Sequence, residues 1–500
     1  MQVAFCQPRY EFRGVWVATV DNIDWPSTKH LTSDSQKAEF IRLLDTHKRN
    51  GMNAIIAQIR PATDAFYPSQ FEPWSEWLTG IQGKPPVPYY DPLEFMISET
   101  HKRGMEFHAW MNPYRAEFMI GTSSISPTHI TRIHPEWFLV YGDKKYFDPG
   151  NKKVQEFVGG VVQDVVSRYD VDAIHFDDYF YPYRIAGKEF PDTLSYRLYS
   201  HNLLKDDWRR SNVDSIIVLL SRIIKKEKRF CKFGISPFGV WRNIDKDPEG
   251  SNTKAGQTNY DDLYADILLW VRMKWIDYVA PQLYWEFSQK VVGFATLIEW
   301  WSTHAYGRQL FIGQGIYRAG ESRSPAWKSP LELPNQIKKL REYRQIQGSV
   351  FFSSKTFYKN PNGWNDSLKN NYYKFPAIIP PMAWIDSVKP SAPNFSSFKI
   401  LNNNHSPQLC TFVGTILNPN TNVSQYAVFK SANKEDLFIA APAVILPASR
   451  ELKFEIENME KETIPFYLTV TGISHTNVES IITTIYRVEK LKGEWSIKKL

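Results

Sequence analysis

From residue 13 to about residue 357 the chain alternates between short runs of strand-forming residues and longer amphipathic segments. In the amphipathic segments apolar residues recur three and four positions apart, as in Phe40, Leu43, Leu44 and His47, which predicts helices. Strands separated by helices pair in parallel. The strand candidates occupy residues 13–19, 53–61, 105–114, 172–179, 232–240, 277–285, 310–317 and 349–357. An α/β fold with this number of units is a (β/α)8 barrel. The alternative is an open doubly wound sheet, but neither a GxGxxG motif nor a P-loop follows the first strand.

The hydrophobic pattern changes after residue 375. Residues 376–393 are rich in proline, which predicts a hinge. Residues 394–500 contain short β-rich runs separated by Asn, Ser, Lys and Gly turns, a spacing typical of a small antiparallel sandwich. We therefore predict a catalytic barrel over residues 10–375 and an all-β accessory domain over residues 394–500.

The parity of each barrel strand predicts which side chains point toward the barrel axis. In the fourth strand Ile174 and Phe176 share the face that packs on the helices, so His175, Asp177 and Tyr179 face the interior. The same argument, applied to the other strands, gives the inward residues Gln58, Arg60, His108, Trp110, Asn112, Gln282, Tyr284 and Glu286. These residues occupy the carboxyl-terminal halves of their strands, which is the end where barrel enzymes carry their active sites.

The predicted cleft is acidic, aromatic and rich in hydrogen-bonding groups. Two carboxylates in an aromatic cleft are what glycoside cleavage requires, one to protonate the leaving oxygen and one to attack or to activate water. We predict Asp177 as the ionised partner and Glu286, flanked by Trp285 and Phe287, as the acid. The predicted substrate-binding residues are Arg60, His108, Trp110, Asn112, Tyr114, His175, Tyr179, Trp241, Gln282, Tyr284, Trp285 and Gln314.

Asp178 is kept as a third candidate carboxylate, because strand ends twist and parity is least reliable there. An Asp pair after a strand is often only a helix or turn cap. The inward parity of Asp177 and the polar residues at the other strand ends favour a catalytic interpretation over capping. His108 and His175 are interpreted as hydrogen-bonding residues, since no spaced His pair predicts a metal site.

Composition narrows the function classes. The excess of 60 Lys and Arg over 53 Asp and Glu is small for 500 residues and is not the pattern of a nucleic-acid-binding protein. Aromatic residues make up 15% of the chain, which favours a sugar-binding cleft. Three cysteines far apart in sequence and the absence of HExxH predict no metal site, and no organic cofactor is implied. The sequence contains no run of 18 apolar residues, so no membrane span is predicted.

Five ordered motifs resemble the glycosyl-hydrolase-like 10 family of bacterial proteins. They are FRGVWVATVDNIDWPS (12–27), HAWMNPYR (108–115), IHFDDYFYP (174–182), DWRRSNV (207–213) and APQLYW (280–285). The resemblance implies a (β/α)8 barrel and glycoside hydrolysis, with members linked to the glycan strands of the bacterial cell wall. Carried over by position, it supports as cleft residues Arg60, His108, Trp110, Asn112, Tyr114, Arg115, Asp177, Asp178, Tyr179, Gln282, Tyr284 and Trp285. The stretch VKPSAPNFSS (388–397) resembles the start of a fibronectin type III-like module of the immunoglobulin-like sandwich class.

The resemblance predicts a hydrolase that acts on peptide-free cell-wall glycan. Export to the periplasm or cell surface is usual in the family, whereas the amino terminus here shows neither the basic flank nor the apolar stretch of a signal peptide. We therefore expect an exported protein whose signal has been removed. Two other functions fit an aromatic barrel cleft: carbohydrate binding without turnover and, with less support, metal-dependent polysaccharide deacetylation.

Overall fold

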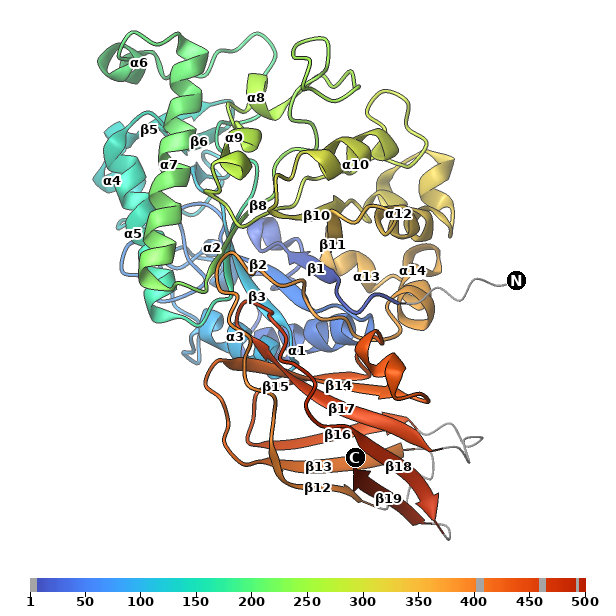
Figure 1. Cartoon of the computed structure of the whole chain (residues 1–500). Helices are drawn as coiled ribbons and strands as arrows, with labels where there is room; N and C mark the ends of the chain where they lie inside the picture. The colour runs from blue at the N-terminus through green and yellow to red at the C-terminus, as the bar shows by residue number, and fades with distance from the viewer. Residues whose placement is uncertain (1–6, 402–408, 458–464, 492–493) are drawn as a thin grey trace.

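The computed structural model describes residues 7–401, 409–457, 465–491 and 494–500. Within these residues eight parallel strands close into a barrel, in the order β1-β11-β10-β9-β8-β7-β3-β2 (Figure 1). Each predicted strand overlaps one of them, so the predicted barrel is confirmed. The strands are β1 (Phe12–Val17), β2 (Ala54–Arg60), β3 (Glu106–Met111), β7 (Ala173–Phe176), β8 (Lys232–Ile235), β9 (Tyr278–Val279), β10 (Gln309–Gln314) and β11 (Ile346–Phe351).

Helices surround the barrel and bury the outward face of its strands. Ile55, Ala57 and Ile59 of β2 pack in the core between the strands and the helices, whereas Ala54 and Ile56 pack inside the barrel. This alternation follows the predicted parity. The longer helices are α1 (Ser33–Arg49), α3 (Pro92–His101), α5 (Lys152–Arg168), α7 (Lys205–Glu227), α10 (Phe294–Thr303) and α12 (Glu332–Leu340), and the shorter ones are α2 (Glu76–Thr79), α4 (Ile130–Ile133), α6 (Thr193–Tyr199), α8 (Asn259–Asp262), α9 (Ile267–Arg272), α11 (Arg318–Glu321), α13 (Ser354–Phe357) and α14 (Trp364–Ser367).

A small antiparallel sheet lies within the connection from β3 to α5, and the sequence analysis did not predict it. Its strands are β4 (Arg115–Glu117), β5 (Phe138–Tyr141) and β6 (Lys144–Phe147), in the order β4-β6-β5. Gly142 takes the positive φ of 67° in the turn between β5 and β6. A Gly-Asp turn between two apolar runs was the available signal. The sheet matters for the site because β4 carries Arg115.

The carboxyl-terminal region is all β, as predicted. It forms two antiparallel sheets, ordered β12-β13-β16 and β15-β14-β17-β18-β19. Side chains from both sheets, such as Phe412 and Val428, share one core. The strands are β12 (Phe395–Leu401), β13 (Leu409–Ile416), β14 (Val423–Ser431), β15 (Val444–Pro447), β16 (Glu451–Glu457), β17 (Phe466–Ser474), β18 (Tyr486–Leu491) and β19 (Glu494–Lys499).

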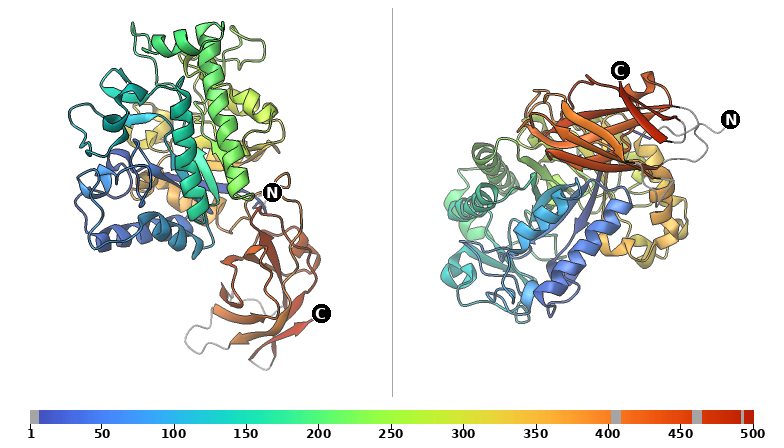
Figure 2. Two further views of the ribbon diagram at one scale, coloured as in Figure 1. Left: turned by 90° about the vertical axis from the view of Figure 1, so that its left-hand side faces the viewer. Right: turned by 90° about the horizontal axis from the view of Figure 1, so that it is seen from below.

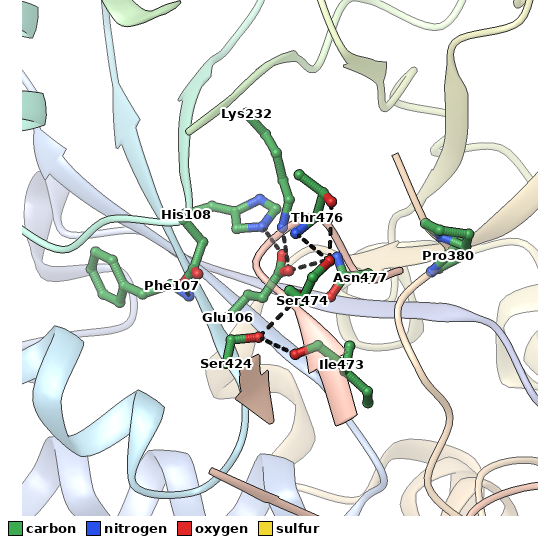
Figure 3. A network of polar contacts seen from close by, with 12 residues as sticks. Glu106, Phe107, His108, Lys232, Pro380, Ser424, Ile473, Ser474, Thr476 and Asn477 are labelled. Carbon is green, nitrogen blue, oxygen red and sulfur yellow. Dashed lines mark hydrogen bonds and ion pairs between the residues drawn. The ribbon is translucent and has the colours of Figure 1, made fainter. Parts of the chain in front are cut away.

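These sheets lie beyond one end of the barrel, and the left-hand view of Figure 2 shows them below it. That end is the amino-terminal one. Asn477, from the turn after β17, donates a hydrogen bond of 2.9 Å to Glu106, the first residue of β3, and Lys232, the first residue of β8, contacts the same carboxylate (Figure 3). The opposite, carboxyl-terminal end of the barrel is left for a functional site.

The Pro-rich segment 376–393, for which a hinge is predicted, is packed against the barrel. Ile379 and Met382 are buried in the same apolar cluster as the interior of the barrel. The side chain of Gln309 donates to the carbonyl oxygen of Pro380 at 2.6 Å, and the indole of Trp384 donates to Asp277 at 3.0 Å. The segment therefore covers the amino-terminal end of the barrel and connects it firmly to the two sheets.

The described part of the chain shows neither a metal-binding cluster nor a membrane span. No three His, Cys, Asp or Glu residues in it are grouped so that they would hold a metal ion. None of its helices combines the length and the apolar character needed to cross a membrane. Cys231 and Cys410 are buried free thiols, and Cys6 lies outside the described residues.

Candidate active site

A pocket of about 390 Å³ opens at the carboxyl-terminal end of the barrel. Its wall is mostly aromatic and aliphatic, with two carboxyl groups, two guanidinium groups and a few neutral polar groups, a composition typical of small-molecule sites. The lining residues are Trp16, Ala18, Val20, Ile23, Gln58, Trp110, Arg115, Asp177, Asp178, Tyr179, Tyr183, Ser236, Phe238, Gln282, Tyr284, Trp285, Tyr317, Arg318 and Phe352.

The pocket lies at this end because several strands finish there together. Asp177 follows the last residue of β7, Ser236 follows the last residue of β8, and Phe352 follows the last residue of β11. In a barrel of parallel strands the carboxyl ends all face the same side, and the loops after them form the site. The position of the pocket therefore agrees with the predicted cleft.

Asp177 is held by hydrogen-bond donors on one side of the pocket. The indole Nε1 of Trp110 donates to its Oδ2 at 3.0 Å, the amide of Asn112 donates to both oxygens at 3.1 and 3.2 Å, and the backbone N–H of Tyr179 donates at 3.3 Å. Burial raises the pKa of Asp177, while the charge of Arg115 and these hydrogen bonds oppose the rise. Such donors stabilise the ionised form of a carboxyl group that is only 3% exposed.

Asp178 sits beside Asp177 in the same pocket and is 2% exposed. The hydroxyl of Tyr183 donates to its Oδ2 at 2.5 Å. Burial, together with the nearby charge of Asp177, raises the pKa of Asp178 to about 7. Two neighbouring carboxyl groups with different surroundings are the pattern by which enzymes separate an acid from its ionised partner.

A raised carboxyl pKa alone does not identify a catalytic residue. Burial also raises the pKa of Asp64 and of Asp214 to about 7. Neither of these side chains lines the pocket: Asp64 accepts hydrogen bonds from Ala62 and Gln82, and Asp214 accepts one from Trp270 at 2.6 Å. What distinguishes Asp177 and Asp178 is that they share an open pocket with aromatic walls.

Many of the predicted site residues come together in this pocket. Asn112 is placed just behind the lining, since its side-chain oxygen accepts a hydrogen bond of 2.8 Å from the backbone N–H of Arg115 and its amide group is thereby turned toward Asp177. The predicted residues that line the pocket itself are Trp110, Arg115, Asp177, Asp178, Tyr179, Gln282, Tyr284 and Trp285.

Arg60 lies outside the pocket lining and supports the site from behind. Its guanidinium is buried, forms an ion pair with Glu72 and donates to the carbonyl oxygens of Asn112 and Pro113. This contact fixes the loop that carries Asn112. The residue was predicted to bind substrate because inward parity was taken as exposure, whereas the structure places its charged end under the loop.

Three further predicted residues are also packed away from the pocket lining. The ring of Trp241 stacks on Trp300 at 6.1 Å, and its indole donates to Asp266 at 3.2 Å. The amide of Gln314 donates to Gln336 at 2.9 Å. Tyr114 is fully buried in the outer core. These side chains hold neighbouring elements together.

His108 and His175 belong to a polar column inside the barrel, below the pocket. The donor-only indole Nε1 of Trp16 contacts His175 Nε2 at 3.2 Å, so that nitrogen accepts and Nδ1 carries the proton. His175 Nδ1 then donates to the hydroxyl of Tyr278 at 2.9 Å, which donates to His108 Nδ1 at 2.8 Å. His108 Nε2 in turn donates to Glu106 at 2.9 Å. Burial lowers the pKa of His175, which keeps its ring neutral.

Glu286 lies in a second pocket of about 360 Å³ that adjoins the first. The two pockets share Tyr284, Trp285 and Arg318 as lining residues. Glu286 is half-buried and directly follows Trp285 in the chain. The structure thus brings Asp178, rather than Glu286, into the same pocket as Asp177.

Several lining residues were not named by the sequence analysis. Trp16 has the same inward parity on β1 as Ala18, which was a readable signal. Tyr183 follows the IHFDDYFYP motif by one residue. Arg318 and Phe352 lie in the loops after β10 and β11, where no periodic pattern indicates which way a side chain points.

The family profile described as Glycosyl hydrolase-like 10 matches residues 11–329. The chain belongs to the glycosyl hydrolase-like 10 family. This assignment makes it a glycoside hydrolase, the enzyme class that the sequence motifs predict. Glycosyl hydrolase YngK of Bacillus subtilis (strain 168) is 48% identical over 399 residues, which cover 79% of this chain and 78% of that protein. Glycosyl hydrolase DigH of Escherichia coli (strain K12) is 38% identical over 370 residues, covering 69% of this chain and 83% of that protein.

One solved structure to which the chain is similar is the glycoside hydrolase domain of PgaB (BpsB) from Bordetella bronchiseptica. It is 13% identical, with a TM-score of 0.47, and the match covers 72% of this chain and 98% of that domain. The catalytic domain of a β-amylase from Paenibacillus polymyxa matches with 12% identity, the same TM-score, and coverage of 73% of this chain and 98% of that domain.

Proposed function

We propose that the enzyme cleaves glycosidic bonds in bacterial cell-wall glycan strands that have lost their peptides, using Asp177 and Asp178 as the two working carboxyl groups. The observation that carries the proposal is the pair itself: two buried carboxyl groups side by side in an aromatic pocket at the carboxyl end of the barrel. The substrate part of the proposal rests on the resemblance of the five motifs to a family linked with cell-wall glycan.

The two aspartates take different roles. Asp178, with its pKa raised to about 7, is the group that still holds a proton near neutral pH and can pass it to the departing glycosidic oxygen. Asp177, with its four hydrogen bonds from Trp110, Asn112 and Tyr179, is the ionised partner that acts on the sugar's anomeric carbon directly or through a water molecule. The aromatic wall supplies flat apolar surfaces for the sugar rings.

This division of roles predicts the pH dependence of the reaction. The acid form of Asp178 is lost as the pH rises through about 7, so kcat/KM falls on the alkaline side of that value. A pH profile of kcat/KM measured between pH 5 and 9 checks this. A rate that stays constant up to pH 9 contradicts the assignment of Asp178 as the acid.

The function is tested by incubating the purified protein with peptide-free cell-wall glycan, chitin and starch, with and without a chelator. New reducing ends that persist in chelator and vanish in Asp177→Asn support the proposal. Binding of glycan without new reducing ends supports a carbohydrate-binding protein instead. Released acetate that chelator abolishes supports a metal-dependent deacetylase.

Bacterial cell-wall glycan lies outside the cytoplasm. An enzyme that acts on it must reach it there, so we propose that the natural protein is exported.

Glu286 remains the sequence-based candidate for the acid, and a second variant decides between it and Asp178. If Asp178 is the acid, Asp178→Asn loses activity and Glu286→Gln keeps kcat within about tenfold of the wild type, because its carboxyl group lies in the adjoining pocket. The reverse result restores the pairing of Asp177 with Glu286.

A further inference from the structure

Two cationic side chains line the catalytic pocket. Neither forms an ion pair among the described residues, and the Nε of each has no hydrogen-bond partner, but they differ in the charge that lies beside them. Arg115 is 6% exposed, lies over the ring of Tyr179 at 4.7 Å and acts electrostatically on Asp177. Arg318 begins the short helix α11, in the loop that follows β10. Among the described residues no carboxylate forms an ion pair with Arg318, and its buried Nε has no hydrogen-bond partner. Its guanidinium contacts the ring of Tyr317, 5.2 Å from the ring centre.

Arg318 also stands where the two pockets meet. It lines both the catalytic pocket and the adjoining pocket, together with Tyr284 and Trp285. Each pocket has the size of a site for a small organic group, about 390 and 360 Å³. A chain of sugar units that fills the first pocket and continues into the second therefore passes the guanidinium group. Aromatic rings on either side of it lower the local polarity, which strengthens a charge-assisted contact.

We infer that Arg318 binds a carboxylate carried by the glycan, so that the enzyme selects acidic glycan strands over neutral ones. A guanidinium group without an anionic protein partner presents paired N–H donors in the geometry of a carboxylate. In peptide-free cell-wall glycan each disaccharide repeat carries one free lactyl carboxylate, whereas chitin has the same backbone without it. This inference rests on the proposed function and adds the feature by which that substrate is recognised.

The contact is expected to contribute to binding rather than to the chemical step. Arg318 lines both pockets together with Tyr284 and Trp285, and the donors that orient Asp177 come from other residues. An interaction that is equally strong in the bound substrate and in the transition state changes KM and leaves kcat unchanged. Arg318→Gln is therefore expected to raise KM for acidic glycan about 10- to 100-fold, the range of a lost charge-assisted hydrogen bond.

The experiment compares peptide-free glycan with the same glycan after its carboxyl groups have been converted to amides. Wild-type enzyme should show a 10- to 100-fold higher KM for the amidated glycan, and Arg318→Gln should show the same KM for both within about threefold. Arg323→Gln is the matched control, because this exposed arginine five residues further along lines neither pocket. It should behave as the wild type does.

The results separate this inference from the proposed function. If the wild type cleaves both glycans with equal KM, the inference is overturned and the proposed function stands. If the wild type cleaves neither, calorimetric binding of soluble glycan fragments to Asp178→Asn decides. The inference is supported, even in the absence of turnover, if binding is lost both when the glycan is amidated and when Arg318 is replaced. If binding depends on neither, the inference is overturned.

Discussion

The barrel contains buried carboxyl groups at both of its ends, and it treats them in opposite ways. At the amino-terminal end Glu106 contacts the ammonium of Lys232 and accepts hydrogen bonds from His108 and Asn477 (Figure 3). At the carboxyl-terminal end Asp178 accepts a hydrogen bond from Tyr183 and has the charge of Asp177 beside it. Both groups are almost completely buried.

The difference in partners reverses the direction of the pKa shift. Burial on its own would raise the pKa of Glu106, but the charge of Lys232 and the hydrogen bond from His108 hold it below its ordinary value. Burial and Asp177 raise the pKa of Asp178 to about 7. The comparison shows that one fold favours the ionised form of a carboxyl group where it joins two parts of the molecule, and favours the protonated form of another inside the pocket.

The largest expected effect is on turnover. Asp178→Asn removes the proposed proton donor without changing the size of the side chain, and we expect kcat to fall by about 10²- to 10⁴-fold. Release of reducing ends from peptide-free glycan measures it. Glu106→Gln, assayed below its unfolding temperature, serves as the control from the other end of the barrel. An equal loss of kcat in Asp178→Asn and Glu106→Gln would contradict a functional difference between the two ends of the barrel.

The next effect concerns stability at the amino-terminal end. Glu106→Gln removes the carboxylate that contacts the buried ammonium of Lys232, and we expect the free energy of unfolding to fall by about 3–5 kcal/mol. Urea unfolding at pH 7 measures it. The double variant Glu106→Gln with Lys232→Met removes both charges and should recover much of the loss. A single variant as stable as the wild type would show that the ion pair contributes nothing.

The third expected effect has the opposite sign. The folded-state pKa of Asp178, about 7, lies above its ordinary value of 3.8, so the folded protein binds more protons between these pH values than the unfolded chain does. This group therefore lowers the free energy of unfolding as the pH rises through that window. Asp178→Asn should be more stable than the wild type at pH 8, by at most about 4 kcal/mol.

The pH series contains its own check. At pH 4 the carboxyl group of Asp178 is protonated in the folded protein, so the advantage of Asp178→Asn should nearly disappear there. Asp34→Asn, a change at an exposed aspartate of α1, provides the matched control and should show no such trend. An advantage of Asp178→Asn that is the same at pH 4 and pH 8 would rule out ionisation as its cause.

The smallest effect isolates the contact between the barrel and the sheets. Asn477 has a positive φ of 63° and donates to Glu106 at 2.9 Å. Asn477→Gly keeps the backbone conformation and removes the hydrogen bond, so we expect a loss of about 1–2 kcal/mol in thermal or urea unfolding. Asn477→Asp places a second carboxylate beside Glu106 and should cost more. If Asn477→Asp is more stable than Asn477→Gly, the negative charge of Glu106 does not determine the stability of this contact.

The fold was largely readable from the sequence because it depends on periodicity. Alternation within strands places Ile55 and Ile174 against the helices and Trp110 and His175 toward the interior, whatever the loops do. The small sheet that carries Arg115 was missed, since its short strands belong to a long connection. Strand parity also does not indicate the position of a side chain along the barrel axis. His108 points inward as predicted, but it lies near the amino-terminal end of the barrel, below the pocket.

The choice between Asp178 and Glu286 shows why the rest of the site was not readable. β7 ends at Phe176, so strand parity no longer governs Asp178, and the turn that follows brings its carboxyl group into the pocket. Glu286 lies past the end of β9, where the chain leads into the adjoining pocket. Both positions depend on how loops from different strands pack against each other.

The sequence by itself determined the eight-stranded barrel, the all-β carboxyl-terminal region and the family, because apolar periodicity and local motifs are properties of neighbouring residues. Only the tertiary structure decided which buried carboxyl groups have a cationic partner. Lys232 reaches Glu106 and Asn477 reaches the same group from the other part of the molecule, across 126 and 371 positions of the chain. The pKa of a buried group depends on charges close in space, and their distance along the chain carries no information about that.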